Sequence, residues 1–408
     1  MKKLKRLIAT ITCVLTAFFS LTFTACKEKQ IEIDDYPQPI QTVEEDENVA
    51  NESDSDKKNE DDSEEKALTD TELEALLDAS DPFEKGIFTF NPRCIPFYMA
   101  QKYKDRPEVI MNALAYLEAV YNQDTEFEMP TEDKLDIEGY IDALELAEMS
   151  NPMISAVRLD TEDFLHYKVV YLPKFILVEN EENGFPDIMP GEAENQDEAK
   201  RVIGDFVDYI CETVNKNVSA DDSDIEKARA VYEGLANDLG IVDLENYKDG
   251  TVIYAEDIEE MLNRRTLIEG ALEKKLDQME TARLYRFILS QLNIECYAVQ
   301  ASGTYYKQND EKLDAFMKDA YFNVWNVVVS DGKAYNCDLF YEIAILDTIK
   351  KDNSNATADM TYFGMSDETR NKSFNVTKTS LKSLNSFMYE DVPSDVLIPE
   401  CVEDYISE

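Results

Sequence analysis

Apolar residues recur every three or four positions in several stretches of the chain, a spacing that places them on one face of a helix. After Pro107, for example, Val109, Ile110, Ala113 and Leu117 follow this spacing. Patterns of this kind, two of them opened by capping-box sequences, predict where helices begin. Helices are expected from Thr69, Pro107, Thr131, Glu192, Ser223 and Gln278, with a further one at Asp310–Lys318.

Other stretches are rich in Val, Ile, Tyr and Phe and predict strands. The expected strands are Ser155–Leu159, Phe164–Val178, Glu295–Ala301, Tyr321–Ser330 and Lys333–Phe340. The Asp-Gly pair at 331–332 separates the last two and is a strong hairpin signal. Alternation along the first strand of that hairpin places Tyr321, Asn323, Trp325 and Val327 on one face. The mixture of helices and strands predicts an α+β fold.

The N-terminus has the layout of an export signal. Lys2, Lys3, Lys5 and Arg6 are followed by a short apolar stretch that ends in Phe-Thr-Ala before Cys26. Small residues before a cysteine resemble a bacterial lipobox, so residues 1–25 are expected to be removed and Cys26 to carry lipid. An ordinary secretory signal and an uncleaved anchor are the alternatives. Lipidation would place the protein on the extracytoplasmic face of a cell membrane.

An acidic linker is expected at residues 26–67. It contains runs such as E-E-D-E-N and N-E-D-D-S-E-E and has almost no large apolar side chains after Ile40. Such a stretch cannot bury enough surface to offset its chain entropy, so it is expected to be a disordered, extended tether.

Roughly 340 residues after the linker exceed what one core usually supports, so two domains are expected. The first, a small α+β domain, spans residues 68–191, and the second spans residues 192–370. Residues 371–408 are expected to be a C-terminal tail without an assigned place.

The formal net charge of −46 limits the possible partners. Repulsion from phosphates argues against nucleic acid and anionic lipid as ligands. Asp221, Asp222 and Asp224 suggest a cation site at first sight, but acidic residues at a helix N-terminus are the commoner explanation. No loop has metal-ligand spacing, so no metal or other cofactor is expected.

A chain of motifs crosses the second predicted domain. The sequence reads G-A-L at 270–272 and Q-M-E-T-A-R-L-Y-R-F-I-L-S-Q-L-N-I at 278–294. It continues with N-V-W-N at 323–326, D-G-K at 331–333 and Y-N-C-D at 335–338. Taken together, these motifs resemble the transglutaminase-like superfamily, over residues 224–368. The resemblance implies a papain-like arrangement of one helix against an antiparallel sheet, after a smaller α+β domain.

The same resemblance places a Cys–His–Asp triad at Gln278, Asn323 and Asp338, so only the acid is retained. A glutamine amide offers no thiolate, and an asparagine cannot accept and return a proton near neutral pH. The second predicted domain is therefore expected to be a degenerate member of the superfamily with no catalytic residues.

A rearranged thiol site would need other groups. The chain has one histidine, His166, which lies far upstream in a predicted strand. Without Cys13 and Cys26, five cysteines remain, an odd number that cannot all pair within the chain. Cys296 and Cys337 are expected to fill core positions, and Cys337, beside Asp338, is a weak candidate for a displaced nucleophile.

Two functions follow as expectations. The favoured one is a membrane-anchored, non-catalytic lipoprotein whose cleft binds a peptide or protein, or which acts as a structural module at the cell surface. The alternative is a thiol peptidase or acyltransferase with a rearranged active site.

Overall fold

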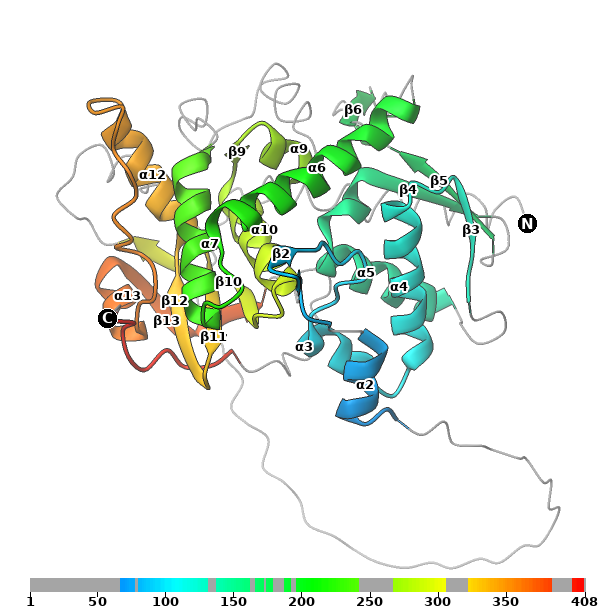
Figure 1. Ribbon diagram of the computed structural model, residues 1–408, viewed down its shortest axis with the longest axis horizontal. Helices are drawn as coiled ribbons and strands as arrows, with labels where there is room; N and C mark the ends of the chain where they lie inside the picture. Colours follow the sequence, from blue (N-terminus) through cyan, green and yellow to red (C-terminus); the bar gives the residue numbers. More distant parts are fainter. Residues whose placement is uncertain are drawn as a thin grey trace, which may run out of the picture. The chain divides into compact units, whose positions relative to one another are not determined.

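The protein has an α+β fold (Figure 1). The computed structural model describes residues 67–77, 80–130, 137–161, 166–171, 174–178, 187–191, 196–241, 267–305, 322–383 and 398–406. From Ala67 onward the chain forms one compact unit. The predicted signal sequence, Cys26 and nearly all of the predicted linker lie outside the described residues.

All six helices with predicted starts are present. They are α2 (Asp70–Leu77), α4 (Pro107–Tyr121), α5 (Ile137–Ser150), α6 (Gln196–Asn217), α7 (Asp224–Asp238) and α10 (Gln278–Gln291). The predicted beginnings of α5 and α6, and the helix expected at 310–318, lie outside the described residues. Four further helices had no prediction: α3 (Phe97–Ala100), α9 (Leu267–Leu272), α12 (Leu339–Lys350) and α13 (Asp367–Ser373).

The main sheet has four antiparallel strands in the order β12-β11-β10-β13. Its strands are β10 (Cys296–Tyr305), β11 (Phe322–Ser330), β12 (Lys333–Cys337) and β13 (Phe374–Ser383). The predicted Asp-Gly hairpin joins β11 to β12, and Asp331 and Gly332 have φ angles of 52° and 72°. Two positive φ angles are what a tight hairpin turn requires.

Smaller sheets accompany the main one. A three-stranded sheet has the order β3-β5-β4, two further pairs are antiparallel, and β8 pairs with β9 in parallel. The strand predicted at 164–178 is wrong as a single element, since its two halves belong to different sheets. The strands are β1 (Phe83–Glu84), β2 (Ile87–Phe88), β3 (Glu126–Glu128), β4 (Val157–Thr161), β5 (His166–Tyr171), β6 (Lys174–Val178), β7 (Asp187–Gly191), β8 (Gly240–Ile241) and β9 (Lys275–Leu276).

The strand predicted at Lys333–Phe340 is too long. β12 ends at Cys337, and Asp338 is the N-cap of α12, so Leu339 and Phe340 are helical. The Asp338 carboxylate accepts a hydrogen bond from the backbone N–H of Tyr341, which favours a helix start at this point.

The C-terminal region also differs from its prediction. The motif resemblance also implies a last strand of the sheet at residues 361–363, but the last strand is β13, which lies in the predicted tail and pairs with β10. The boundary predicted after residue 370 falls inside α13, and residues 398–406 pack against the same region. Much of the predicted tail is therefore part of the folded unit.

Residues from both predicted domains contribute to one apolar core. The ring of Phe90 meets that of Phe287 with centroids 6.0 Å apart. Asn91 and Gln291 exchange two hydrogen bonds, in which the Asn91 N–H donates over 2.8 Å and the Gln291 amide returns a bond of 2.9 Å. The domain boundary predicted after Gly191 stays a prediction. Residues from both sides of that boundary in the sequence contact α10.

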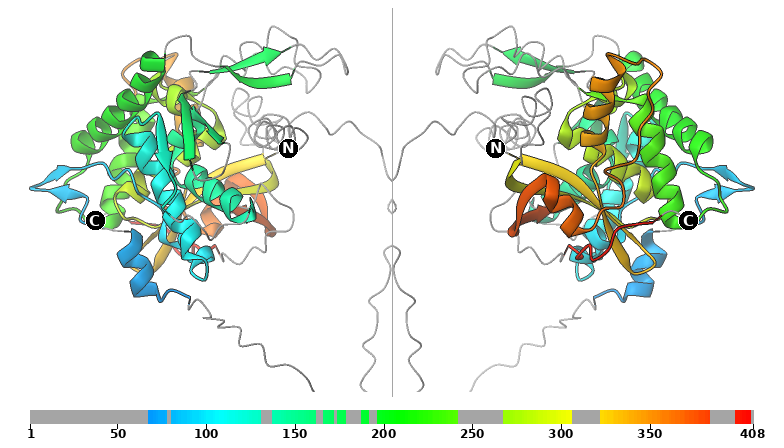
Figure 2. Two further views of the ribbon diagram at one scale, coloured as in Figure 1. Left: turned by 90° about the vertical axis from the view of Figure 1, so that its right-hand side faces the viewer. Right: turned by 90° about the vertical axis from the view of Figure 1, so that its left-hand side faces the viewer.

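The two faces of the main sheet have different neighbours (Figure 2). On one face, Ala282 of α10 packs against Ala298 and Val324, and its carbonyl oxygen accepts a bond of 2.9 Å from the Asn326 amide. We call this the α10 face. The opposite, outer face carries a second apolar cluster of Tyr297, Val299, Trp325, Val327, Ala334 and Cys401.

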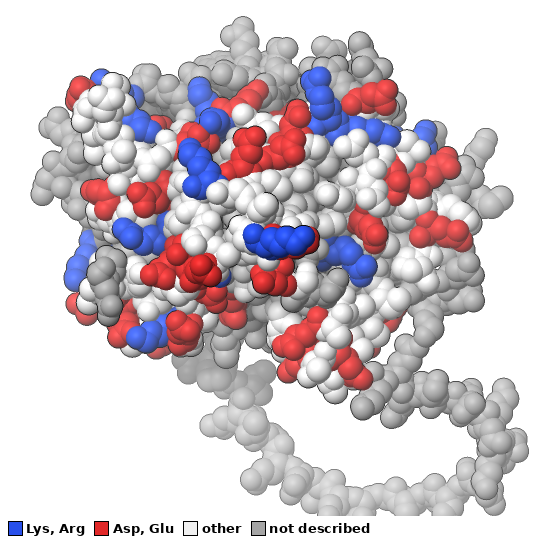
Figure 3. Space-filling model, viewed as in Figure 1, with Lys and Arg blue, Asp and Glu red and all other residues white. Residues whose placement is uncertain are grey.

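Charge is spread over the surface of the unit. On the face shown in Figure 3, acidic side chains occur across several elements, with Lys and Arg side chains between them. Exposed ion pairs of the described residues include Lys333 with Glu403 and Lys274 with Asp238. The acidic excess is therefore a general property of this face and not a single patch.

Candidate functional site

Gln278, at the position predicted for a nucleophile, is the first residue of α10 and is half-buried. Asp277 is the N-cap, and its carboxylate accepts the Glu280 N–H over 2.8 Å. Glu280 in turn accepts the Asp277 N–H over 3.0 Å, which completes a capping box. A thiolate in a catalytic site would be stabilised by the partial positive charge at this helix end, but two carboxylates already lie there.

Asn323, at the position predicted for a base, lies in β11 and pairs with Ala301 of β10. The alternation expected on this strand is confirmed for Trp325 and Val327, which share the outer-face cluster. The side chains of Tyr321 and Asn323 lie outside the described residues.

The structure brings the neighbourhoods of the first two positions together. Met279, next to Gln278, packs against the same small cluster as Val324, which is next to Asn323. The N-terminal turn of α10 therefore lies against β11.

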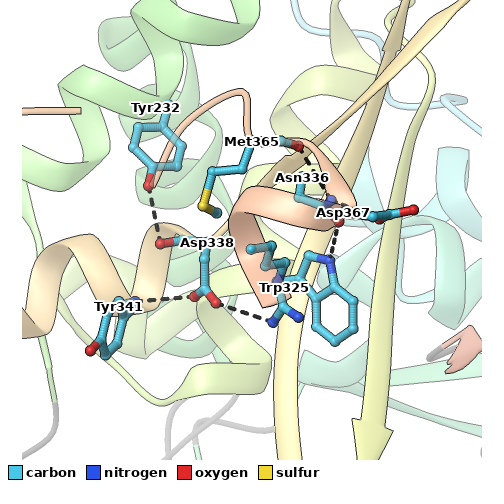
Figure 4. A network of polar contacts seen from close by, with 8 residues as sticks. Tyr232, Trp325, Asn336, Asp338, Tyr341, Met365 and Asp367 are labelled. Carbon is cyan, nitrogen blue, oxygen red and sulfur yellow. Dashed lines mark hydrogen bonds and ion pairs between the residues drawn. The ribbon is translucent and has the colours of Figure 1, made fainter. Parts of the chain in front are cut away.

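Asp338, the retained acid, is buried at the start of α12 (Figure 4). One oxygen accepts the Tyr341 N–H over 3.3 Å, and the other lies 3.5 Å from Nη2 of Arg370. The side chains are 1% and 2% exposed, respectively. Burial raises the pKa of Asp338 to about 6, although the charge of Arg370 opposes the rise. The acid is thus occupied by an arginine and a helix end.

Arg370, from α13, had no role in the sequence prediction. Its guanidinium lies over the Trp325 ring, 3.4 Å from the centroid. The Trp325 Nε1–H donates to Asn336 over 2.8 Å, and the Asn336 amide donates to Asp367 over 3.0 Å. Burial lowers the pKa of Arg370 to about 10, so the side chain still carries its charge at neutral pH. The result is a connected polar network beside Asp338 (Figure 4).

A second buried carboxylate lies one turn further along α12. Glu342 accepts the N–H groups of Met360 and Tyr362 over 3.1 and 3.0 Å. The Tyr232 hydroxyl, from α7, lies 3.4 Å from Glu342 and 3.0 Å from the carbonyl oxygen of Asp338. Burial raises the pKa of Glu342 to about 7. Its partners are backbone groups of the α12–α13 connection, so its evident task is to hold that connection.

The buried thiols near this site are not activated. Burial raises the pKa of Cys296 to about 12 and raises the pKa of Cys337 well above its ordinary value. Both side chains are fully buried in the main sheet, which confirms the core positions expected for them. A nucleophilic thiol needs the opposite shift and access to a substrate.

His166 lies in β5, in the three-stranded sheet, where its side chain is 65% exposed. Its Nε2 is 3.8 Å from a carboxylate oxygen of Glu128. It belongs to a sheet other than the one that carries Asn323, and no imidazole is available elsewhere because the chain has a single histidine.

Two other kinds of site are absent from the described part of the chain. No group of three His, Cys, Asp or Glu side chains there could hold a metal ion. No helix there is long and apolar enough to cross a membrane.

Arg370 is the most informative residue that sequence reasoning missed. It lies 32 residues from Asp338, and no local pattern connects the two. The one available signal is that Arg370 follows Asp367 by three positions. This spacing places both on a short helix at the end of the segment, residues 224–368, that resembles the transglutaminase-like superfamily. That signal gives no hint that the arginine is buried.

Comparison with known proteins adds little. No protein-family model and no curated protein matches the chain. Among solved structures, the chain is similar to one from Parabacteroides distasonis described as a "putative protease", with 12% sequence identity and a TM-score of 0.19. The match covers 44% of this chain and spans only 35% of that one. A likeness of this strength carries no argument about the site.

Proposed function

We propose that this chain is an exported lipoprotein with a degenerate transglutaminase-like domain that performs no catalysis. In this proposal the domain binds a peptide or protein, or acts as a structural module, at the cell surface. The family part of the proposal depends on the motifs between residues 224 and 368. The non-catalytic part depends on the contacts of the retained acid.

The observation that carries the proposal is the buried pair of Asp338 and Arg370. In a Cys–His–Asp site the acid must accept a bond from the base and orient it. Here Arg370 and the Tyr341 N–H take the two oxygens of Asp338. The positions before it hold Gln278 and Asn323, so the nucleophile and the base are missing and the remaining acid is bound to Arg370.

An activity assay tests this proposal directly. The purified protein is expected to neither cleave peptide libraries nor incorporate amines into glutamine substrates. An electrophilic thiol probe is expected to label the folded protein no faster than a surface cysteine of ordinary pKa. Turnover that disappears in Cys296→Ala or Cys337→Ala would instead establish the alternative, a thiol peptidase or acyltransferase with a rearranged site.

A gain-of-function variant tests the ancestry of the cleft. Gln278→Cys with Asn323→His restores the residue types of the triad, but Asp338 would still be bound to Arg370. We therefore expect measurable turnover only when Arg370→Met is added, in a triple variant that still folds. Equal inactivity of the folded double and triple variants would argue against a catalytic geometry behind these positions.

The anchor is a separate part of the proposal, and it rests on sequence alone. Cys26 follows the apolar stretch and Ala25, and residues 1–66 lie outside the described residues. Cys26→Ser is expected to release the protein from the membrane fraction or to leave its precursor uncleaved. Normal processing with membrane retention in that variant would contradict lipidation at this position.

A further inference from the structure

In the α12–α13 connection, residues 351–366, three successive backbone N–H groups donate to two carboxyl groups. Glu342 accepts the N–H groups of Met360 and Tyr362 over 3.1 and 3.0 Å. Asp359 accepts the N–H between them, that of Thr361, over 3.0 Å. Met360 has a φ of 66°, in the left-handed region that residues other than glycine rarely adopt. The two carboxyl groups therefore hold the backbone in a conformation that it rarely takes.

These two carboxyl groups also contact each other. The side chains of Glu342 and Asp359 are hydrogen-bonded to one another. An ionised carboxylate is only an acceptor, so a hydrogen bond between two such groups needs one proton between them. Glu342 is 3% exposed, whereas Asp359 lies at the surface. Because burial disfavours the charged form, the buried member holds the proton, and the exposed member gives that proton a route to water.

The titratable groups around Glu342 come from α7, α12 and the connection itself. Tyr232, from α7, places its hydroxyl 3.4 Å from the Glu342 carboxyl group and 3.0 Å from the carbonyl oxygen of Asp338 (Figure 4). Asp338 lies one turn earlier on α12, where the guanidinium of Arg370 compensates its charge. Asp359 adds a second negative charge from the connection. The positive charge of Arg370 is thus committed to Asp338, while Asp359 adds to the cost of ionising Glu342.

The electrostatics of the cluster agree with one shared proton. Burial raises the pKa of Glu342 to about 7, and the charge of Asp359 contributes to the rise. The pKa of Asp359 is lowered, first by a hydrogen bond from the Thr361 side chain and also by the one from Glu342. The neighbours of Tyr232 in this cluster, which stay neutral because burial raises their pKa, are Tyr285 and Cys337. Above about pH 6, where Asp338 is already ionised, Glu342 is the group of this cluster that loses its proton.

We propose that Glu342 and Asp359 form a proton-operated latch on the α12–α13 connection. With one proton shared between them, the pair holds residues 358–363 closed. When that proton leaves to water past the exposed Asp359, two negative charges face each other, and the Asp359 side chain turns into solvent. Glu342 is then a buried charge, and its cost falls when the connection opens and water reaches it. The connection therefore opens more often as pH rises.

Opening of the latch reaches the start of α12. The carbonyl oxygen of Tyr362 accepts the Asp338 N–H over 2.9 Å, and the Phe363 ring packs edge-on against Tyr232 with centroids 5.2 Å apart. Displacement of residues 358–363 removes both contacts beside the buried Asp338. The latch goes beyond the proposed function, because it needs neither a bound ligand nor catalysis.

Hydrogen exchange measures the latch directly. Opening lets water reach Glu342, whose pKa then falls from about 7 toward its ordinary value of 4.5. A group with a raised folded pKa stabilises the closed form at low pH and loses that effect as pH rises through the folded value. Protection of residues 358–363, corrected for the intrinsic rise of exchange with pH, is therefore expected to fall about tenfold between about pH 6 and about pH 8.

Mass spectrometry of peptides from residues 358–363 gives this measurement in the intact chain. Peptides from β12 are the internal control. Their protection should change by less than about twofold over the same interval, because the latch opens locally and leaves the main sheet in place.

Two variants of the pair should flatten the response. Glu342→Gln keeps a neutral side chain of the same size, so protection should change by less than about twofold, which is the part that Asp338 supplies. Asp359→Asn places an amide donor beside Glu342 and should reduce the change to less than about threefold. Asp352→Asn, at an exposed site in the same connection, is the matched control and should keep the fall of about tenfold.

The parent protein and Asp359→Asn test the latch even if Glu342→Gln does not fold. The proposal is overturned if protection of residues 358–363 stays constant or rises with pH, or if β12 loses protection to the same extent. It is also overturned if Asp359→Asn, or a folded Glu342→Gln, keeps the full fall seen in the parent.

Discussion

The N-termini of α10 and α12 use the same residue in opposite surroundings. Asp277 caps α10 at the surface, where its carboxylate and that of Glu280 form a capping box. Asp338 caps α12 in the interior, where its second oxygen lies against Arg370. Both carboxylates satisfy backbone N–H groups that a helix start leaves without a partner in the helix. The two caps differ in how far water could replace the hydrogen-bond partner of the carboxylate if that partner were lost.

The difference separates what a thiol site of the proposed family would need from what these two helix starts provide. A thiol site of the implied type needs a helix end that can stabilise a thiolate and an acid that can orient a base. At the surface cap, Asp277 and Glu280 supply negative charge where the thiolate would be. At the buried cap, Arg370 neutralises the acid. Both helix starts have partners that stabilise the fold, and the consequences of losing each should differ greatly.

The largest effect is expected for Arg370→Met. It removes the charge that compensates Asp338 but keeps most of the side-chain volume on Trp325. Loss of one partner of a buried ion pair typically costs about 3–5 kcal/mol, and a fall of that size in the free energy of unfolding is expected at pH 8. Denaturant unfolding gives the measurement. Arg201→Met, at an exposed site, is the control and should change stability by less than about 0.5 kcal/mol.

A double variant shows whether the loss comes from the pair. Asp338→Asn combined with Arg370→Met removes both charges of the pair, so the total loss should be smaller than the sum of the two single losses by about 1–3 kcal/mol. Additive losses would mean that Arg370 acts through its packing on Trp325 and not through Asp338. The Asp277 and Asp338 caps would then differ in burial, and the ion pair with Arg370 would not contribute to the difference.

A pH titration should sharpen the comparison. The folded pKa of Asp338, about 6, lies above its ordinary value of 3.8, so the folded state holds the extra proton between these values. Stability from this group is therefore lost as pH rises from about 4 to about 6. The advantage of the parent protein over Asp338→Asn should shrink across that interval by an amount on the order of 1–3 kcal/mol.

The opposite sign is expected at Asp404, which makes it the control for the titration. Its pKa is lowered by the Ser366 N–H, so its stabilisation is present above the ordinary carboxyl pKa and is lost as pH falls through the folded value. Parent and Asp404→Asn should therefore diverge as pH rises. If the stability difference between the parent and Asp338→Asn also grows as pH rises, the Asp338 carboxylate is ionised in the fold at all of these pH values.

The smallest effect is expected for Asp277→Ala. It removes one surface cap, and the lost stability should be about 1 kcal/mol, because water replaces part of the bond to the Glu280 N–H. Thermal or denaturant unfolding measures it, with Glu233→Ala in the exposed middle of α7 as the control. A loss as large as that of Arg370→Met would mean that the α10 start is as sensitive as the buried one.

The features that sequence predicted well are local. The α10 start has its cap, its capping partner and its apolar stripe within a few residues of Gln278, and the β11–β12 hairpin is fixed by Asp331 and Gly332. The mixed α+β class follows from such signals, because each element carries its own pattern.

The features that sequence missed depend on distant partners. Lys333–Phe340 has a strand-like composition throughout, and only the cap at Asp338 ends the strand early. β13 pairs with β10 across about 70 residues of chain, a separation that local pattern cannot bridge. Arg370 looks like a surface residue of a charged helix, and its burial depends on Trp325 and Asp338, which lie elsewhere in the sequence.

The reactivity of the described cysteines can be used to measure local opening of the fold. All five are free thiols, four of them are buried, and they lie in the N-terminal part, α6, the main sheet and residues 398–406. A buried thiol reacts with a small reagent only while its surroundings are transiently open, so its rate reports the free energy of that opening. Pulsed labelling read by mass spectrometry would rank these regions in the native protein without a single substitution. Cys401 should react well before Cys337, so local opening of residues 398–406 could be timed separately from global unfolding.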